Sequence, residues 1–128
     1  MPDNDISAGL KQFIFEYVDS VELIEVLLFI RSNSDKWFNA SQISAELRSN
    51  PTSIANRLSR LANIGLIEED NDLIRFLPNN DELKAIVTEL SNEYLLRRHR
   101  IFELIFSSSK TARQFANAFI VNKKPSGD

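Results

Sequence analysis

The chain has 128 residues, of which 43% are apolar, and its 18 acidic and 15 basic side chains give a net charge of −3. This length and apolar content predict a single domain, residues 1–128, with a substantial core. The absence of cysteine excludes disulfides, thiolate catalysis and cysteine-based zinc sites. No apolar run approaches the roughly 18 residues of a membrane span and no signal pattern opens the chain, so we expect a bacterial cytoplasmic protein without a membrane partner.

Two helices are predicted near the start of the chain. Apolar residues recur at spacings of three and four along 6–17, which is typical of a helix with one buried face. Phe15 lies off that face, where it is either an ordinary exposed residue or a contact with a second subunit. Asp19 and Glu22 then form a capping-box pattern. The following residues, 21–30, are apolar almost all round, so this second helix is expected at the centre of the core.

A short strand and a short helix are predicted next. Trp37 and Phe38 are expected to pair with a hairpin further along the chain, and core packing is the favoured role of Trp37. Asn39 and Gln42 stand three residues apart, as in a capping box. They predict a helix over residues 39–47.

The best-marked helix runs over residues 51–63. Asn50 is placed to cap it, Pro51 stands in the first turn, where a missing N–H costs nothing, and Gly65 is placed to end it in the left-handed conformation. Its buried face consists of Ile54, Leu58 and Leu61. Only residues 48–50 separate it from the preceding helix, and so tight a turn predicts a helix-turn-helix, whose second helix can lie in a DNA major groove.

The outward face of that helix carries no acid, although acids outnumber bases in the chain. At about 100° per residue, this face consists of Thr52, Asn56, Ser59, Arg60 and Asn63, with Ser53 and Arg57 on its flanks. A helix that merely faces solvent would usually carry glutamate there. The pattern therefore indicates a binding face.

Two short strands, 66–69 and 73–77, are predicted after Gly65, with turn-forming residues between them. Helix, turn, helix and hairpin together make a winged helix. Four carboxylates lie on or beside the tip of this hairpin: Glu68, Glu69, Asp70 and Asp72. DNA would repel such a tip, so a solvated turn, a wing that stays off the DNA and a contact with a basic protein all remain open.

A long helix is predicted from Asn79 up to the serine run 107–109. Asn79 and Glu82 form its capping box, and its apolar residues fall on two faces, which implies burial by its own domain and by a partner. A last short helix, with apolar residues from Ala112 to Phe119, is expected before the polar C-terminal tail. We expect residues 5–18 and 79–121 to flank the winged-helix core of this single domain and to form a homodimer.

The strongest basic cluster is 97–100, Arg-Arg-His-Arg. Consecutive residues on a helix spread over all its faces, so this cluster could pair with acids of the N-terminal helices, contact phosphate or bind an anionic ligand. His99 is the only histidine, which makes a histidine metal site or a Ser-His-Asp triad improbable. With three glycines there is no phosphate-binding loop. We expect no cofactor, no metal and no enzymatic activity.

Residues 39–77 resemble the winged-helix domain of MarR-type bacterial transcription regulators. The resemblance is carried by Ser53 to Leu61, which match the family's recognition helix, and by Gly65-Leu66-Ile67-Glu68, which match the strand that follows it. It implies a mainly α fold: a winged helix-turn-helix core over residues 20–78, a small β-wing and terminal dimerisation helices. The chain departs from the family in its short length, in a recognition helix with few bases and in a wing without arginine at its tip.

The expected function is therefore sequence-specific binding of double-stranded DNA by a dimeric transcription regulator. Thr52 and Ser53 would contact phosphate or base edges, Asn56 would suit adenine, and Arg57 or Arg60 would suit guanine or phosphate. Arg48 is expected on the same face. The rival hypothesis is a winged helix used as a protein-interaction module, which the net charge and the acidic wing favour. A small-molecule effector is compatible with either function and cannot be identified from the sequence.

Overall fold

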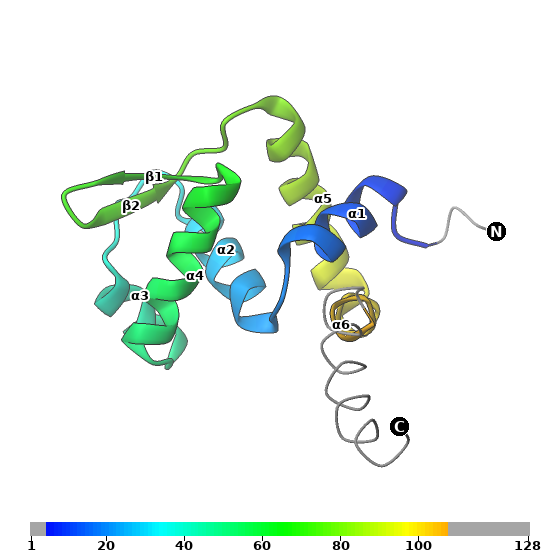
Figure 1. The fold of residues 1–128 in the computed structure, drawn as a ribbon, viewed down its shortest axis with the longest axis horizontal. Helices are drawn as coiled ribbons and strands as arrows, with labels where there is room; N and C mark the ends of the chain where they lie inside the picture. Colours follow the sequence, from blue (N-terminus) through cyan, green and yellow to red (C-terminus); the bar gives the residue numbers. More distant parts are fainter. Residues whose placement is uncertain (1–4, 108–128) are drawn as a thin grey trace, which may run out of the picture.

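The computed structural model describes residues 5–107, which form a mainly helical domain with a two-stranded antiparallel hairpin (Figure 1). The elements in chain order are α1 (Ala8–Tyr17), α2 (Val21–Ser32), α3 (Ala40–Leu47), α4 (Pro51–Ile64), β1 (Ile67–Asp70), β2 (Leu73–Phe76), α5 (Asp81–Leu96) and α6 (Arg98–Phe106). No helix in this described part is long and apolar enough to cross a membrane.

Helix α2 lies at the centre of the domain, as its nearly uniform apolar sequence predicts. It packs against α3, α4 and β2, and its buried residues are Leu23, Ile24, Val26, Leu27 and Ile30. At its end, the Arg31 side chain donates hydrogen bonds to the hydroxyls of Thr88 (3.3 Å) and Ser91 (3.5 Å) of α5. Helices α3 and α4 on one side and α1, α5 and α6 on the other share one continuous core. Helix α2 lies between these two groups and joins them.

Helices α3 and α4 are the two short helices predicted for this stretch; they follow one another across residues 48–50 and pack together. The capping box at the start of α3 is present, with Asn39 and Gln42 exchanging two hydrogen bonds of 2.8 Å. The side chain of Asn50 accepts from the N–H groups of Thr52 and Ser53 and so caps α4. Helix α4 ends at Gly65, whose φ of 98° is the left-handed conformation expected there. Both ends of α4 are thus confirmed.

The hairpin lies at one end of the molecule (Figure 1). Its turn contains two residues, Asn71 and Asp72, both with positive φ (52° and 69°), the conformation that a two-residue hairpin turn requires. Phe38 pairs with Ile74 through two backbone hydrogen bonds of 2.8 and 2.7 Å, so the predicted short strand is a single bridge. The prediction that Trp37 packs in the core is wrong: the residue is half-buried and does not belong to the core cluster, and the Arg75 guanidinium lies 5.0 Å from its ring centroid.

The other end of the molecule consists of α1, α5 and α6, which pack on one another. The prediction of one long helix from Asn79 onward is wrong, because Arg97 (φ −140°, ψ 55°) separates α5 from α6. After the break α6 packs against α1 and α5, and Ile101, Leu104 and Ile105 are its buried residues.

Two predicted caps are displaced. The side chain of Asn80, not Asn79, caps α5 by accepting from Leu83 N–H at 2.8 Å, and α5 therefore begins at Asp81. At the start of α2 the cap is Ser20. Glu22 does not reach back to complete a capping box there. Its carboxylate instead contacts α4 and the turn before it.

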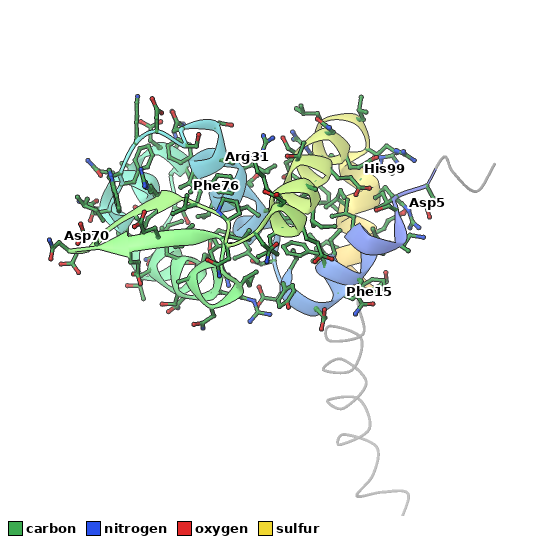
Figure 2. All side chains as sticks on the ribbon, turned by 90° about the horizontal axis from the view of Figure 1, so that it is seen from above. Asp5, Phe15, Arg31, Asp70, Phe76 and His99 are labelled. Carbon is green, nitrogen blue, oxygen red and sulfur yellow. The ribbon has the colours of Figure 1, made fainter. Side chains whose placement is uncertain are left out.

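Two expectations concern the termini. Phe15 is half-buried and packs against the core of its own chain, so it does not point freely outward as expected; Figure 2 labels it on α1. The last helix predicted from the sequence, Ala112 to Phe119, lies outside the described residues. The described residues contain six helices. This number includes α5 and α6, which together replace the single long helix predicted from the sequence.

Candidate nucleic-acid interface

The outward face of α4 is uncharged. Its exposed positions are Pro51, Thr52, Ala55, Asn56, Ser59 and Asn63, so none of the exposed positions of this helix carries a charge. The buried face is formed by Ile54, Leu58 and Leu61, as predicted. The exposed side chains are short, and short side chains let another surface approach the helix backbone closely.

The turn before α4 is held rigidly by backbone and hydroxyl contacts. Ser44, the only buried polar residue of the described part, donates from its hydroxyl to the Ser49 carbonyl at 3.0 Å. The Ser49 N–H donates back to the Ser44 carbonyl at 2.9 Å. Arg48 adopts the left-handed conformation (φ 55°) and is exposed. The turn therefore presents the Arg48 side chain to solvent, next to the start of α4.

Three donors converge on the carboxylate of Glu22. The hydroxyls of Ser49 and Ser53 each donate to it, and the Arg57 Nε donates to its Oε1 at 3.0 Å. The hydroxyls of Ser49 and Ser53 and the Arg57 guanidinium hold the pKa of Glu22 below its usual range, against the opposing effect of burial. Glu22 is therefore ionised at neutral pH. Ser53 and Arg57, predicted to contact DNA, have an intramolecular partner here.

Arg60 is turned toward α1 and away from the exposed row of α4. Its Nε donates to the carbonyl of Tyr17 at 2.7 Å, and its NH2 donates to the carbonyl of Glu16 at 3.4 Å. These two carbonyls end α1 and have no partner within that helix. Arg60 therefore caps α1 from outside, with Asp19 3.8 Å away. The expectation that Arg60 lies on the outward face is wrong.

The hairpin carries its acids at the tip and away from the body of the domain. Asp70 projects at the far end of the molecule in Figure 2. Glu69, Asp70 and Asp72 are exposed, whereas Glu68 pairs across the hairpin with Arg75 at 2.9 Å. The hairpin therefore presents three carboxylates to solvent.

The basic cluster 97–100 lies at the opposite end of the molecule, where Figure 2 labels His99 and Asp5. Arg97 pairs with Glu93 at 2.9 Å, and the Arg98 guanidinium lies 4.7 Å from the centroid of the Tyr94 ring. Arg100 pairs with Asp5 at 2.9 Å and with Glu103 at 3.2 Å. The Arg100 guanidinium, with help from Lys11, holds the pKa of Asp5 below its usual range. Of the three roles left open, pairing with acids is the one that these contacts support.

A groove lies where α1, the end of α4 and the start of α5 meet. It encloses about 400 Å³, and Phe13, Tyr17, Ile64, Leu83 and Ile86 provide its apolar lining. The groove offers room for a small molecule, but no polar group buried within it points to a ligand. No group of three or more potential metal ligands occurs among residues 5–107.

The sequence pattern identified α4 and most of its exposed residues but missed Glu22 and Ser49. Glu22 lies 27 residues before Ser49 and 31 before Ser53 in the chain, and its sequence pattern predicts a local cap instead. No local signal links them. Only the packing of α2 against α4 brings the three residues together.

Comparisons of the chain with family models, with curated proteins and with solved structures find no match.

Proposed function

We propose that the protein is a DNA-binding transcription regulator that inserts α4 into a DNA major groove. The order of α2, α3, α4 and the hairpin, with Phe38 bridging to β2, supports a winged helix-turn-helix architecture. The resemblance of residues 39–77 to MarR-type regulators points to the same class.

The uncharged exposed row of α4 is the observation that carries this proposal. In helix-turn-helix proteins the first residues of the second helix contact base edges. Thr52 and Asn56 are exposed on the first two turns of α4, and they offer a hydroxyl and an amide that can read bases. Ala55 and Ser59 beside them are small enough to allow close approach. Nothing in the row repels phosphate.

The contacts of the arginine side chains in the structure favour other roles for them than the sequence predicted. Arg48 is exposed at the turn, which supports the proposal that it contacts a phosphate. The side chains of Arg57 and Arg60 are only 27% and 30% exposed, because acids and carbonyls of α1 and α2 hold them. We therefore assign base reading to Thr52 and Asn56. Arg60 is assigned to the positioning of α1.

The proposal includes a homodimer. Leu95 and Leu96 at the end of α5 are each 76% exposed, and Phe106 at the end of α6 is 66% exposed. Leu95 and Leu96 are consecutive, and exposed apolar side chains that gather on a surface support a protein contact there. A second copy of the chain would give two α4 helices for two half-sites. Sedimentation at micromolar concentration should show twice the 14.6 kDa chain mass. A purely monomeric species would contradict the dimer.

The DNA-binding test compares two exposed asparagines. Asn56→Ala should weaken binding to the duplex upstream of the protein's own gene by about 1–3 kcal/mol and relax discrimination at one base pair. Asn92→Ala, at an exposed position of α5, is the matched control and should bind as wild type. Both variants should keep the wild-type melting temperature, since neither side chain makes a hydrogen bond within the described residues.

Salt dependence gives a second measure. A dimer with one or two available arginines per protomer should show a slope of log K against log salt of about −2 to −4. The proposal fails if the wild type binds no duplex at low salt, or if Asn56→Ala binds as the wild type does.

A protein-interaction module is the second candidate function. The three exposed carboxylates at the hairpin tip and the internal partners of Arg57 and Arg60 favour it. Neutralising Glu69 and Asp70 separates the candidates. Binding of a basic protein would be lost, whereas DNA binding would stay unchanged or tighten modestly because a repulsive charge is removed.

A further inference from the structure

Side chains from three segments form one polar cluster around Glu22. Ser49 comes from the turn, Ser53 and Arg57 come from successive turns of α4, and Glu22 comes from the first turn of α2. All three donors point at one carboxylate. Its side chain is 25% exposed, so the cluster reaches the surface of the protein.

The donors are held in place without Glu22. The backbone of Ser49 exchanges hydrogen bonds with Ser44 (2.9 and 3.0 Å). The backbone of Ser53 is fixed by the Asn50 cap at 3.2 Å and by α4 itself. Arg57 has a second acid, Asp19, at 3.9 Å. The two hydroxyls and the guanidinium would therefore stay close together if the carboxylate left.

The group that the three donors bind in this structure is the Glu22 carboxylate, an anion with two acceptor oxygens. Ser49 and Arg57 donate to different oxygens of Glu22, Oε2 and Oε1, and Ser53 shares Oε1 with Arg57. A phosphate group offers the same kind of charged acceptor, and arginine with hydroxyl donors is a common phosphate-binding set. The carboxylate therefore stands where a phosphate oxygen pair would be bound.

We propose that Ser49, Ser53 and Arg57 form a phosphate-binding site that Glu22 fills in the free protein and that a phosphate group can take over. Glu22 then acts as an internal competitor, which lowers the affinity of the site for phosphate. The site lies beside the exposed start of α4, so under the proposed function the phosphate is one of the DNA backbone. The inference rests on that function only for the source of the phosphate.

The first experiment uses inorganic phosphate and does not depend on DNA. Glu22→Ala should bind phosphate with a Kd roughly ten-fold or more below that of the wild type, because charge-assisted hydrogen bonds become available. Binding is followed by NMR of the Arg57 Nε–H and the Ser53 amide during a phosphate titration at constant ionic strength. Glu25→Gln, which removes the same charge from α2 without contacting α4, is the control and should behave as wild type.

A double variant tests whether the hydroxyl belongs to the site. Adding Ser53→Ala to Glu22→Ala should return phosphate binding toward the wild-type level. If Glu22→Ala does not fold, Glu22→Gln takes its place, since the amide keeps one acceptor for the serines and removes the charge. A folded variant whose Arg57 and Ser53 signals do not respond to phosphate overturns the inference.

The second experiment identifies the source of the phosphate. With duplex DNA, Glu22→Ala should bind several-fold more tightly than wild type, and the salt slope should steepen by about one per protomer. Phosphate binding without any DNA binding by wild type or variant would support the site and reject the proposed function. Tight DNA binding by wild type with no gain in Glu22→Ala would support the function and reject the DNA backbone as the source of the phosphate.

Discussion

Helices α4 and α5 are built by the same local rules and present different surfaces. Both are long, with 14 and 16 residues, and both begin at an asparagine cap. The first turn of α5 carries Asp81 and Glu82, as the helix dipole favours, whereas the first turn of α4 carries no acid. The exposed positions of α5 include charges and two leucines, and those of α4 are uncharged.

This difference indicates what each surface is suited to. The exposed side of α5 meets solvent through its charges and offers apolar contact only at its last turn. The exposed side of α4 omits the charges that solubility and the dipole both favour. Its two arginines, Arg57 and Arg60, are held at its flanks by Glu22 and by the Tyr17 carbonyl. The exposed residues of α4 therefore form a row of uncharged, short side chains. That row suits a partner able to approach the helix closely.

The largest expected effect separates the buried face of α4 from the exposed end of α5. Leu61→Ala should lower the free energy of unfolding by about 2–5 kcal/mol, because it leaves a cavity in the core; Leu61 is fully buried. Leu96→Ala should change the unfolding free energy of the monomer by less than about 0.5 kcal/mol. Urea unfolding measures both. A comparable loss in Leu96→Ala at all protein concentrations would contradict the exposed position of that side chain.

A smaller effect compares the two asparagine caps. Asn50→Ala and Asn80→Ala should each lower the free energy of unfolding by about 0.5–2 kcal/mol, since each leaves helix N–H groups without an acceptor. The two variants should therefore lose similar amounts of unfolding free energy. DNA binding should separate them, with a loss in Asn50→Ala beyond that seen in Asn80→Ala. Equal binding by the two variants would remove the distinction drawn between the helices.

The smallest effect is a pH dependence. The pKa of Glu22 is lowered in the folded protein, so its contribution to stability is present above the unfolded pKa of about 4.3 and is lost as the pH falls below it. The stability difference between wild type and Glu22→Gln should therefore shrink from about pH 6 to about pH 3. Thermal melts over this range, with Glu25→Gln as control, would show it. A difference that is independent of pH would mean that the Glu22 charge contributes nothing.

The sequence alone determined the elements of the α4 region. Asn39 with Gln42, Asn50 with Pro51, and Gly65 each act through backbone groups within a few residues, so their effects are local and were predicted correctly. The spacing of Ile54, Leu58 and Leu61 likewise fixed which face of α4 is buried. The function of the exposed face stays a prediction, because sequence pattern and fold are both compatible with DNA or a protein as the partner.

Only the tertiary structure decided where the long charged side chains go. Arg60 reaches the end of α1, and Glu22 reaches Ser49, Ser53 and Arg57, because helix packing brings distant segments within the length of one side chain. The break at Arg97 is of the same kind: the heptad-like pattern favours a continuous helix, but the structure has two helices, and α6 packs against α1 and α5 with Ile101, Leu104 and Ile105 buried. Local patterns fix the backbone hydrogen bonds of a helix, whereas its charged partners and its bends depend on which other elements pack against it.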